Sequence, residues 1–174
     1  MQPINDILQD EHGCFVYRVL KPLEVRSKLS MGEEYQTGLS FDTGDLVSVD
    51  LVRPSRVRDS KNGPFLRLSD CSGWLFERTH SDQMMARLPV KDGLWAFHVD
   101  NYPVGMALRR HPFDNSPHVE PTMLFESMQL IYCDKQVTAP NGVSSYRVQG
   151  TDGWVFDQRL REQGSKIFML LPEG

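Results

Sequence analysis

The histidines and cysteines that could hold a metal ion number only five and three in this 174-residue sequence, and their spacing is irregular. His111 and His118 share a segment with Asp114 and Glu120, and these are residue types that bind divalent metals. Prolines interrupt the segment repeatedly, and no cysteine lies near it. Metal sites that can be recognised from sequence use short, characteristic ligand spacings. We therefore expect no metal site and no cofactor.

Catalytic residues are equally hard to find. The sequence has no glycine-rich phosphate-binding motif, no Cys–His or Ser–His pair in a recognisable context, and no repeated pair of carboxylates. Cys14 lies in or beside an apolar segment, where a free cysteine usually serves as a small buried hydrophobe. We therefore expect that the protein is not an enzyme.

Composition and charge narrow the class of protein. Lys plus Arg total 19 and Asp plus Glu total 23, so the formal net charge is -4. Proteins that bind nucleic acid usually carry a net positive charge, so nucleic acid is not an expected partner. The sequence shows no secretion signal and no apolar run long enough to cross a bilayer. Three cysteines without a C-x-x-C pair suggest no disulfide framework. We expect a protein of the cytoplasm or another reducing compartment, with no membrane partner.

The sequence also matches itself. Six blocks recur in the same order at offsets of 80 to 84 residues, and the offsets change only between blocks. The clearest match aligns GWLFE at residues 73–77 with GWVFD at residues 153–157. We therefore expect two copies of one small fold, at residues 13–90 and 92–173, joined by a short linker.

Each copy has the pattern of an all-β fold. Apolar residues alternate in short runs, for example at Phe15, Tyr17 and Val19, and glycines and prolines separate the runs. Five or six strands in so short a segment favour a small barrel over a sandwich. Helix is expected only as one or two turns at residues 82–86 and 157–161. The predicted fold is therefore two tandem barrels related by internal duplication.

The strand motifs carry a family resemblance. The segments LEVRS at residues 23–27, GDLVSV at 44–49, FLRL at 65–68 and GWL at 73–75 resemble the bacterial-type SH3 (SH3b-like) barrel. The second copy is similar but weaker. The chain lacks the paired tryptophans and the late Pro-x-x-Tyr of SH3 domains that bind polyproline, so the resemblance does not imply a Pro-x-x-Pro ligand. It implies a ligand face bordered by the loop after the second strand.

That loop is long in both copies, at residues 28–40 and 111–124. Acidic side chains beside an aromatic ring would suit a basic peptide by charge complementarity, although a solvated loop would explain them equally well. The residues in or beside these loops that could bind a partner are Glu33, Glu34, Tyr35, Asp42, Asp114, His118 and Glu120.

Two residue types also recur near the end of each copy. Trp74 and Trp154 could each form the aromatic wall of a peptide groove or fill the end of a barrel. Arg67 and Arg147 could each stack on that ring or simply face solvent. A basic cluster in the first copy could bind an anionic partner or form a solvated hairpin tip, and it contains Arg53, Arg56, Arg58 and Lys61.

These patterns favour a protein-interaction or adaptor module that captures an extended peptide or a partner surface, on the loop face or in a cleft between the two copies. Two alternatives remain open. One is a Tudor-like reader of methylated Lys or Arg, which requires aromatic rings that converge, with Tyr35, Phe41, Phe65 and Trp74 as candidates. The other is a structural subunit that is permanently buried in a larger assembly, which would have large exposed apolar patches. The oligomeric state is left open.

Overall fold

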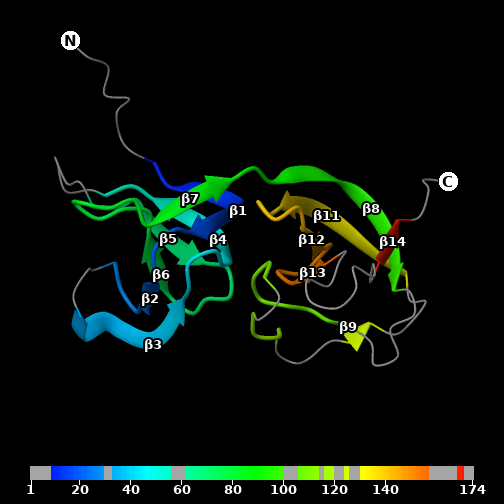
Figure 1. The fold of residues 1–174 in the computed structure, drawn as a ribbon, viewed down its shortest axis with the longest axis horizontal. Coiled ribbons are helices and arrows are strands. Elements are labelled where there is room, and N and C mark those ends of the chain that lie inside the picture. The colour runs from blue at the N-terminus through cyan, green and yellow to red at the C-terminus, as the bar shows by residue number, and fades with distance from the viewer. Residues whose placement is uncertain are drawn as a thin grey trace, which may run out of the picture. The chain divides into compact units, whose positions relative to one another are not determined.

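The protein is built from β-strands (Figure 1). The computed structural model describes residues 9–29, 33–55, 62–99, 106–113, 116–119, 124–125, 130–156 and 168–170. The chain divides into two compact units, Met1–Arg87 and Leu88–Gly174. Within the described residues the only helical turn is the 3-10 turn η1 (Glu33–Tyr35), and no helix is long and apolar enough to span a membrane. The prediction of an all-β fold is confirmed.

The first unit contains one sheet of seven strands in the order β3-β2-β6-β5-β4-β1-β7, and its strands from β3 to β1 pair antiparallel. Its long central strand β4 has buried side chains at successive positions, which indicates that both faces of this strand are covered. The shorter strands β2 and β5 alternate buried and half-buried residues instead. The strands are β1 (Glu11–Val19), β2 (Leu23–Arg26), β3 (Gln36–Phe41), β4 (Leu46–Arg53), β5 (Phe65–Leu68), β6 (Trp74–Phe76) and β7 (Met85–Leu88).

The second unit has a five-stranded sheet in the order β13-β12-β11-β8-β14 and a separate two-stranded sheet, β10-β9. One face of the larger sheet carries the apolar core. The strands are β8 (Lys91–Val99), β9 (Met106–Ala107), β10 (Leu124–Phe125), β11 (Leu130–Thr138), β12 (Ser144–Val148), β13 (Trp154–Phe156) and β14 (Phe168–Leu170). The buried core residues are Phe97, Leu108, Ile131, Cys133, Tyr146, Val148 and Val155.

The strand registers of the two units correspond. The offsets that align the sequence blocks also align the paired positions of the strands, and each unit has a register shift at the same place in its central strand. The pairs Phe15–Val49, Arg67–Trp74 and Leu23–Phe41 of the first unit correspond to Trp95–Cys133, Arg147–Trp154 and Met106–Phe125 of the second.

The prediction that each sheet closes into a barrel is wrong for the described residues. Closure requires the two end strands of a sheet to pair. In the first unit the ends are β3 and β7, and each pairs on one side only. The sheet is also narrow at β2, which meets β6 through the single pair Arg26–Trp74. In the second unit the equivalent junction is the isolated bridge Arg109–Trp154, so the β9–β10 hairpin forms its own sheet.

Two local predictions also need correction. Residues 82–86 do not form a helical turn, because Gln83 bridges to Arg78 and the next strand already starts at Met85. The Gln83 side-chain amide donates a hydrogen bond to the Met85 carbonyl at 2.7 Å, which stabilises this turn. The predicted loop at residues 28–40 contains η1 and most of β3. The other predicted helical segment, residues 157–161, lies outside the described residues.

Candidate functional site

An arginine, a tryptophan and a second arginine lie side by side across three neighbouring strands of the first unit. Arg26 on β2 pairs with Trp74 on β6, and Trp74 pairs with Arg67 on β5. Directly opposed residues point to the same face of a sheet, so the three side chains form a row. The second unit repeats this row with Arg109, Trp154 and Arg147. The sequence pointed to each tryptophan and to one arginine of each row, and it missed Arg26 and Arg109 as neighbours.

Each row ends in an ion pair that the sequence analysis missed. Asp50 occupies the register shift of β4, and its carboxylate accepts two hydrogen bonds from Arg67, at 2.9 and 3.3 Å. Asp134 occupies the equivalent shift of β11 and accepts two from Arg147, at 3.2 and 3.1 Å. The hydrogen bonds that Arg67 donates to the Asp50 carboxylate raise the pKa of the Arg67 guanidinium. The recurring arginines therefore pair with aspartates.

The two tryptophans have different surroundings. Trp74 is half-buried, and the Arg53 guanidinium lies 5.4 Å from its ring centroid. Asp10 holds this arginine through an ion pair of 2.9 Å. Trp154 is fully buried rather than presented on the surface, and no described residue accepts a hydrogen bond from its indole N–H. Only Trp74 could therefore contact a partner in this conformation.

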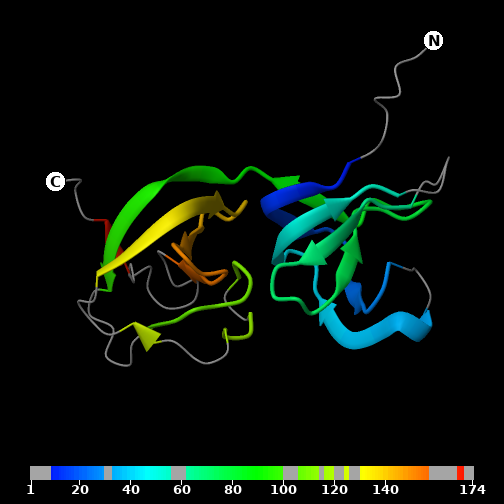
Figure 2. The ribbon, with the colours of Figure 1, turned by 180° about the vertical axis from the view of Figure 1, so that it is seen from behind.

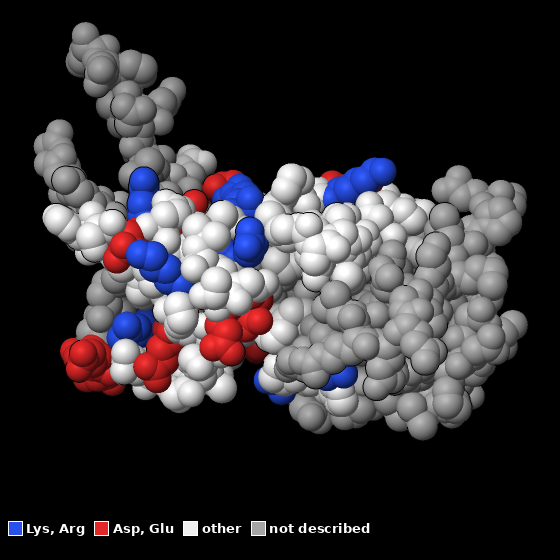
Figure 3. Space-filling model, viewed as in Figure 1, with Lys and Arg blue, Asp and Glu red and all other residues white. Residues whose placement is uncertain are grey.

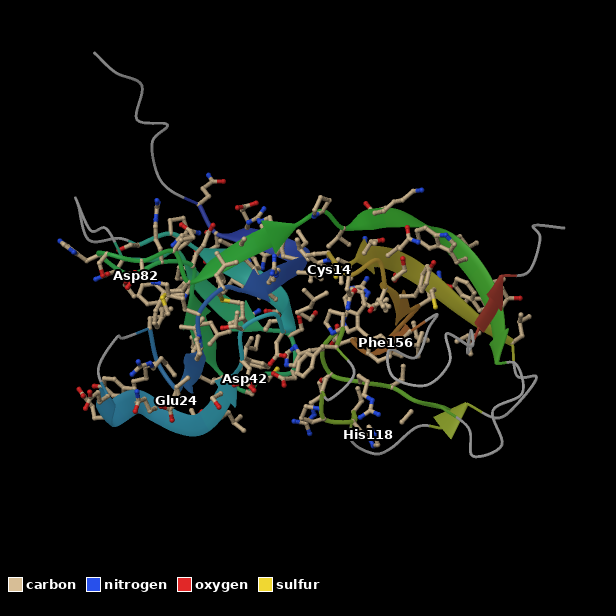
Figure 4. The ribbon with its side chains drawn as sticks, in the orientation of Figure 1. Cys14, Glu24, Asp42, Asp82, His118 and Phe156 are labelled. Carbon is tan, nitrogen blue, oxygen red and sulfur yellow. The ribbon has the colours of Figure 1, made fainter. Side chains whose placement is uncertain are left out.

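Acidic side chains follow the margin of the first unit where η1 and β3 run (Figure 3). Glu33 and Glu34 are exposed on η1, and Asp42 is exposed just after β3. Glu24, on β2, lies opposite Ser40 of β3. Figure 4 shows Glu24 and Asp42 along this same margin. We call these four residues the β3 acidic row.

No member of the β3 acidic row forms an ion pair with a described residue. The ammonium of Lys28, which follows β2, lies 5.2 Å from the Tyr35 ring centroid. Many other carboxylates of the described chain are paired. These pairs are Asp10–Arg53, Glu11–Arg87, Asp50–Arg67, Asp82–Lys21, Asp92–Lys135 and Asp134–Arg147. The negative charge beside β3 is therefore not neutralised by its described neighbours.

Strand β3 itself is unusually open. It is an end strand of the sheet, and among the described residues only β2 pairs with it. It lies at the margin of the first unit in both ribbon views (Figures 1 and 2). The residues from Gln36 to Ser40 are all exposed, and Leu39 retains 51% of its accessible surface. Gly38 has a φ of +85° and lies where the register of β3 against β2 shifts, between the pairs Glu24–Ser40 and Arg26–Gln36.

The predicted loop of the second unit, at residues 111–124, gives less support for a binding site. His118 is half-buried and bridges to Arg109, while its carbonyl accepts a 3.0 Å hydrogen bond from Arg110. Asp114 and Glu120 lie outside the described residues. In the part of the chain that the structure describes, no group of three or more metal-ligating side chains comes together. The basic cluster is described only at Arg53, because Arg56, Arg58 and Lys61 are likewise outside the described residues.

The described residues form an all-β protein with two strand-built units, and β3 provides an exposed sheet edge flanked by acidic side chains. No family model, no curated protein and no solved structure matches the chain. The likeness of its strand motifs to SH3b-like domains therefore stays a prediction.

Proposed function

We propose that this protein is a non-enzymatic interaction module of two duplicated SH3-like units, in which the first unit captures an extended basic peptide. The observation that carries the proposal is the unneutralised β3 acidic row beside an exposed end strand. Opposite charge across an interface steers the encounter of two partners and selects among them. The surface thus favours a partner rich in Lys or Arg.

The matching registers of the two units support an internal duplication. A shared strand order could arise by convergence, but a register shift at the same place in both central strands is a more specific feature. The aspartate at each shift also forms the same ion pair. We regard these rows and ion pairs as the common scaffold and the β3 acidic row as the specialised part of the first unit.

The proposal is tested with a random peptide display library passed over the immobilised protein. We expect enrichment of peptides that contain several Lys or Arg residues. The variant Glu33→Lys/Glu34→Lys/Asp42→Lys should lose this enrichment. A control of equal charge, Asp82→Lys/Asp92→Lys/Asp152→Lys, changes acids outside the β3 acidic row and should retain it, although it also removes the ion pairs with Lys21 and Lys135. No enrichment, or equal enrichment with both variants, would contradict the proposal.

The Tudor-like alternative receives less support. A methyl-lysine cage needs open aromatic faces that surround the ligand cation. The protein's own cations already lie near two of the four candidate rings, Lys28 near Tyr35 and Arg53 near Trp74. A third candidate, Phe41, is buried.

One observation favours the alternative of a buried structural subunit. Leu94, Leu130 and Tyr132 lie on the neighbouring strands β8 and β11 and are 58%, 44% and 48% exposed. Apolar groups gathered on adjacent strands often mark an interface. If this alternative holds, the purified chain should self-associate in sedimentation velocity, and Leu94→Ser/Leu130→Ser should make it monomeric. A monomeric wild-type chain would argue against an interface between copies of this chain.

A further inference from the structure

We infer that the captured peptide binds by strand addition to the free edge of β3, with a basic side chain placed on the face that carries Glu24. This inference deepens the proposed function and rests on it. The peptide extends β3, bonds to the backbone groups on its open edge, and needs positive charge beside Glu24 and near both ends of β3.

The backbone of β3 supplies the first part of the evidence. In an antiparallel pair, successive residues direct their N–H and C=O groups alternately toward the partner strand and away from it. Because β3 pairs only with β2 among the described residues, part of its backbone between Gln36 and Ser40 faces the open edge, although the Leu39 N–H already donates a 3.3 Å hydrogen bond to the Thr37 hydroxyl. Exposed side chains from Gln36 to Ser40 leave this edge accessible. An extended peptide can pair with such an edge through main-chain hydrogen bonds.

The register between β2 and β3 indicates which peptide position would bring a basic side chain close to Glu24. Glu24 lies opposite Ser40, so a peptide residue placed opposite Ser40 would share the face of Glu24. Two strand spacings separate them, roughly 10 Å, which a long Lys or Arg side chain can bridge toward the carboxylate. Asp42 lies beyond one end of β3, and Glu33 and Glu34 lie before the other end. Basic residues near both ends of the peptide would therefore also find partners.

The same acids disfavour self-pairing of β3. An open, exposed strand edge tends to pair with an edge of another copy, and charged residues are a common protection against this. If two β3 edges met, the unneutralised carboxylates of both copies would be brought close together. A basic peptide reverses the sign of that interaction. The β3 acidic row therefore discriminates between two molecules that could form the same backbone hydrogen bonds.

The register shift at Gly38 limits the length of strand that a peptide can pair with. A left-handed residue inside a strand interrupts the regular ladder, so the peptide would pair mainly on one side of Gly38. A Cβ added at Gly38 would meet no atom within 4 Å, so the position is open to solvent. We expect a short footprint, formed by few hydrogen bonds, and a moderate affinity.

The test uses the most enriched peptide from the display library and two N-methylated forms of it. One form carries N-methyl groups at every odd position and the other at every even position, because only one set of N–H groups faces β3 in an added strand. Titration calorimetry should show at least about tenfold weaker binding for one form, as expected for two or more lost hydrogen bonds. The other form should bind within about twofold of the parent.

A second measurement locates the site. Amide resonances of β3 should shift on titration with the parent peptide in two-dimensional NMR spectra, and the Glu24→Gln variant should bind more weakly than wild type. If both N-methylated forms bind like the parent while the triple lysine variant still abolishes binding, strand addition is wrong and the proposed function stands. If the library yields no basic peptide, the proposed function fails and this inference fails with it.

Discussion

The carboxylate of Asp50 receives two hydrogen bonds from the guanidinium of Arg67 across a register shift between β4 and β5. Asp134 and Arg147 repeat this arrangement in the second unit. A shift inserts one residue into a strand and redirects its side chain. In both units the redirected side chain is an aspartate that pairs with the arginine of the neighbouring strand.

The two ion pairs should differ in their contribution to stability. Asp50 and Arg67 are 35% and 42% exposed, whereas Asp134 and Arg147 are 28% and 21% exposed. Exposed ion pairs contribute about 0–1 kcal/mol, and desolvation increases the cost of removing one partner. We expect Asp50→Asn to lower the free energy of unfolding by less than about 1 kcal/mol and Asp134→Asn to lower it by more, in urea titrations. Equal losses would contradict this order.

Stability should fall at high pH through Tyr17. Burial raises the pKa of this tyrosine above its ordinary value of 10.0, although the hydrogen bond from Arg87 acts in the opposite direction. The neutral phenol is therefore favoured in the folded protein. Its contribution is complete below pH 10 and is lost as the pH rises through the folded pKa.

The comparison that tests this is wild type against Tyr17→Phe, with the free energy of unfolding measured from pH 8 upward. The variant should be about 1 kcal/mol less stable near neutral pH because it loses the hydrogen bond from Arg87. Its stability should also decline less steeply above pH 10. Parallel declines in the two proteins would show that Tyr17 is not responsible.

The three cysteines should react at very different rates. Cys71 is exposed, Cys14 is half-buried and Cys133 is fully buried. Burial raises the pKa of the Cys133 thiol to about 12, so almost no thiolate is present at pH 8. With a chromogenic disulfide reagent at pH 8, we expect one fast thiol that Cys71→Ser removes. Cys133 should react only in denaturant, and a fast phase that persists in Cys71→Ser would contradict this assignment.

Two glycines before the tryptophans should tolerate substitution unequally. A Cβ on Gly73 would lie 2.4 Å from the backbone oxygen of Arg26, at a φ of +144°. The three atoms nearest to a Cβ on Gly153 would all belong to the Leu108 side chain, at 2.9–3.0 Å. Gly73→Ala should therefore be the more destabilising change, by roughly 2–4 kcal/mol in thermal or urea unfolding. Gly142→Ala, with a φ of +87° and no neighbour within 4 Å, isolates the conformational cost, about 1 kcal/mol.

The self-comparison of the sequence predicted the strands well because the recurring blocks coincide with the segments that pair in the sheets. Residues that face each other across a ladder must keep their spacing, so offsets change only where the chain is unpaired. Strand β3 was missed because its side chains are nearly all exposed, which removes the alternation that marks a strand. Strand β3 forms because its backbone pairs with β2, and its own sequence has no alternating apolar residues that would predict a strand.

The site was only partly visible in the sequence. Arg67, Trp74 and the acids near β3 could be chosen by residue type, but the ion-pair partner Asp50 could not, because a register shift depends on tertiary packing. A signal was present: an aspartate directly follows the matched block in both copies, at Asp50 and Asp134. The burial of Trp154 could not be predicted from the sequence, because Trp154 and Trp74 follow a glycine in nearly the same motif.

The narrow junction between β2 and β6 has a consequence for motion. The hairpin of β2 and β3 joins the rest of its sheet through one paired position, Arg26–Trp74, while Leu23 and Val25 anchor it by burial. Opening this hairpin would expose far less apolar surface than unfolding the whole unit, so it is a natural unit of local unfolding. Its amide hydrogens should exchange with solvent sooner than those of β4. A peptide bound along β3 would then slow that exchange, because it would stabilise the β2–β3 hairpin against local unfolding.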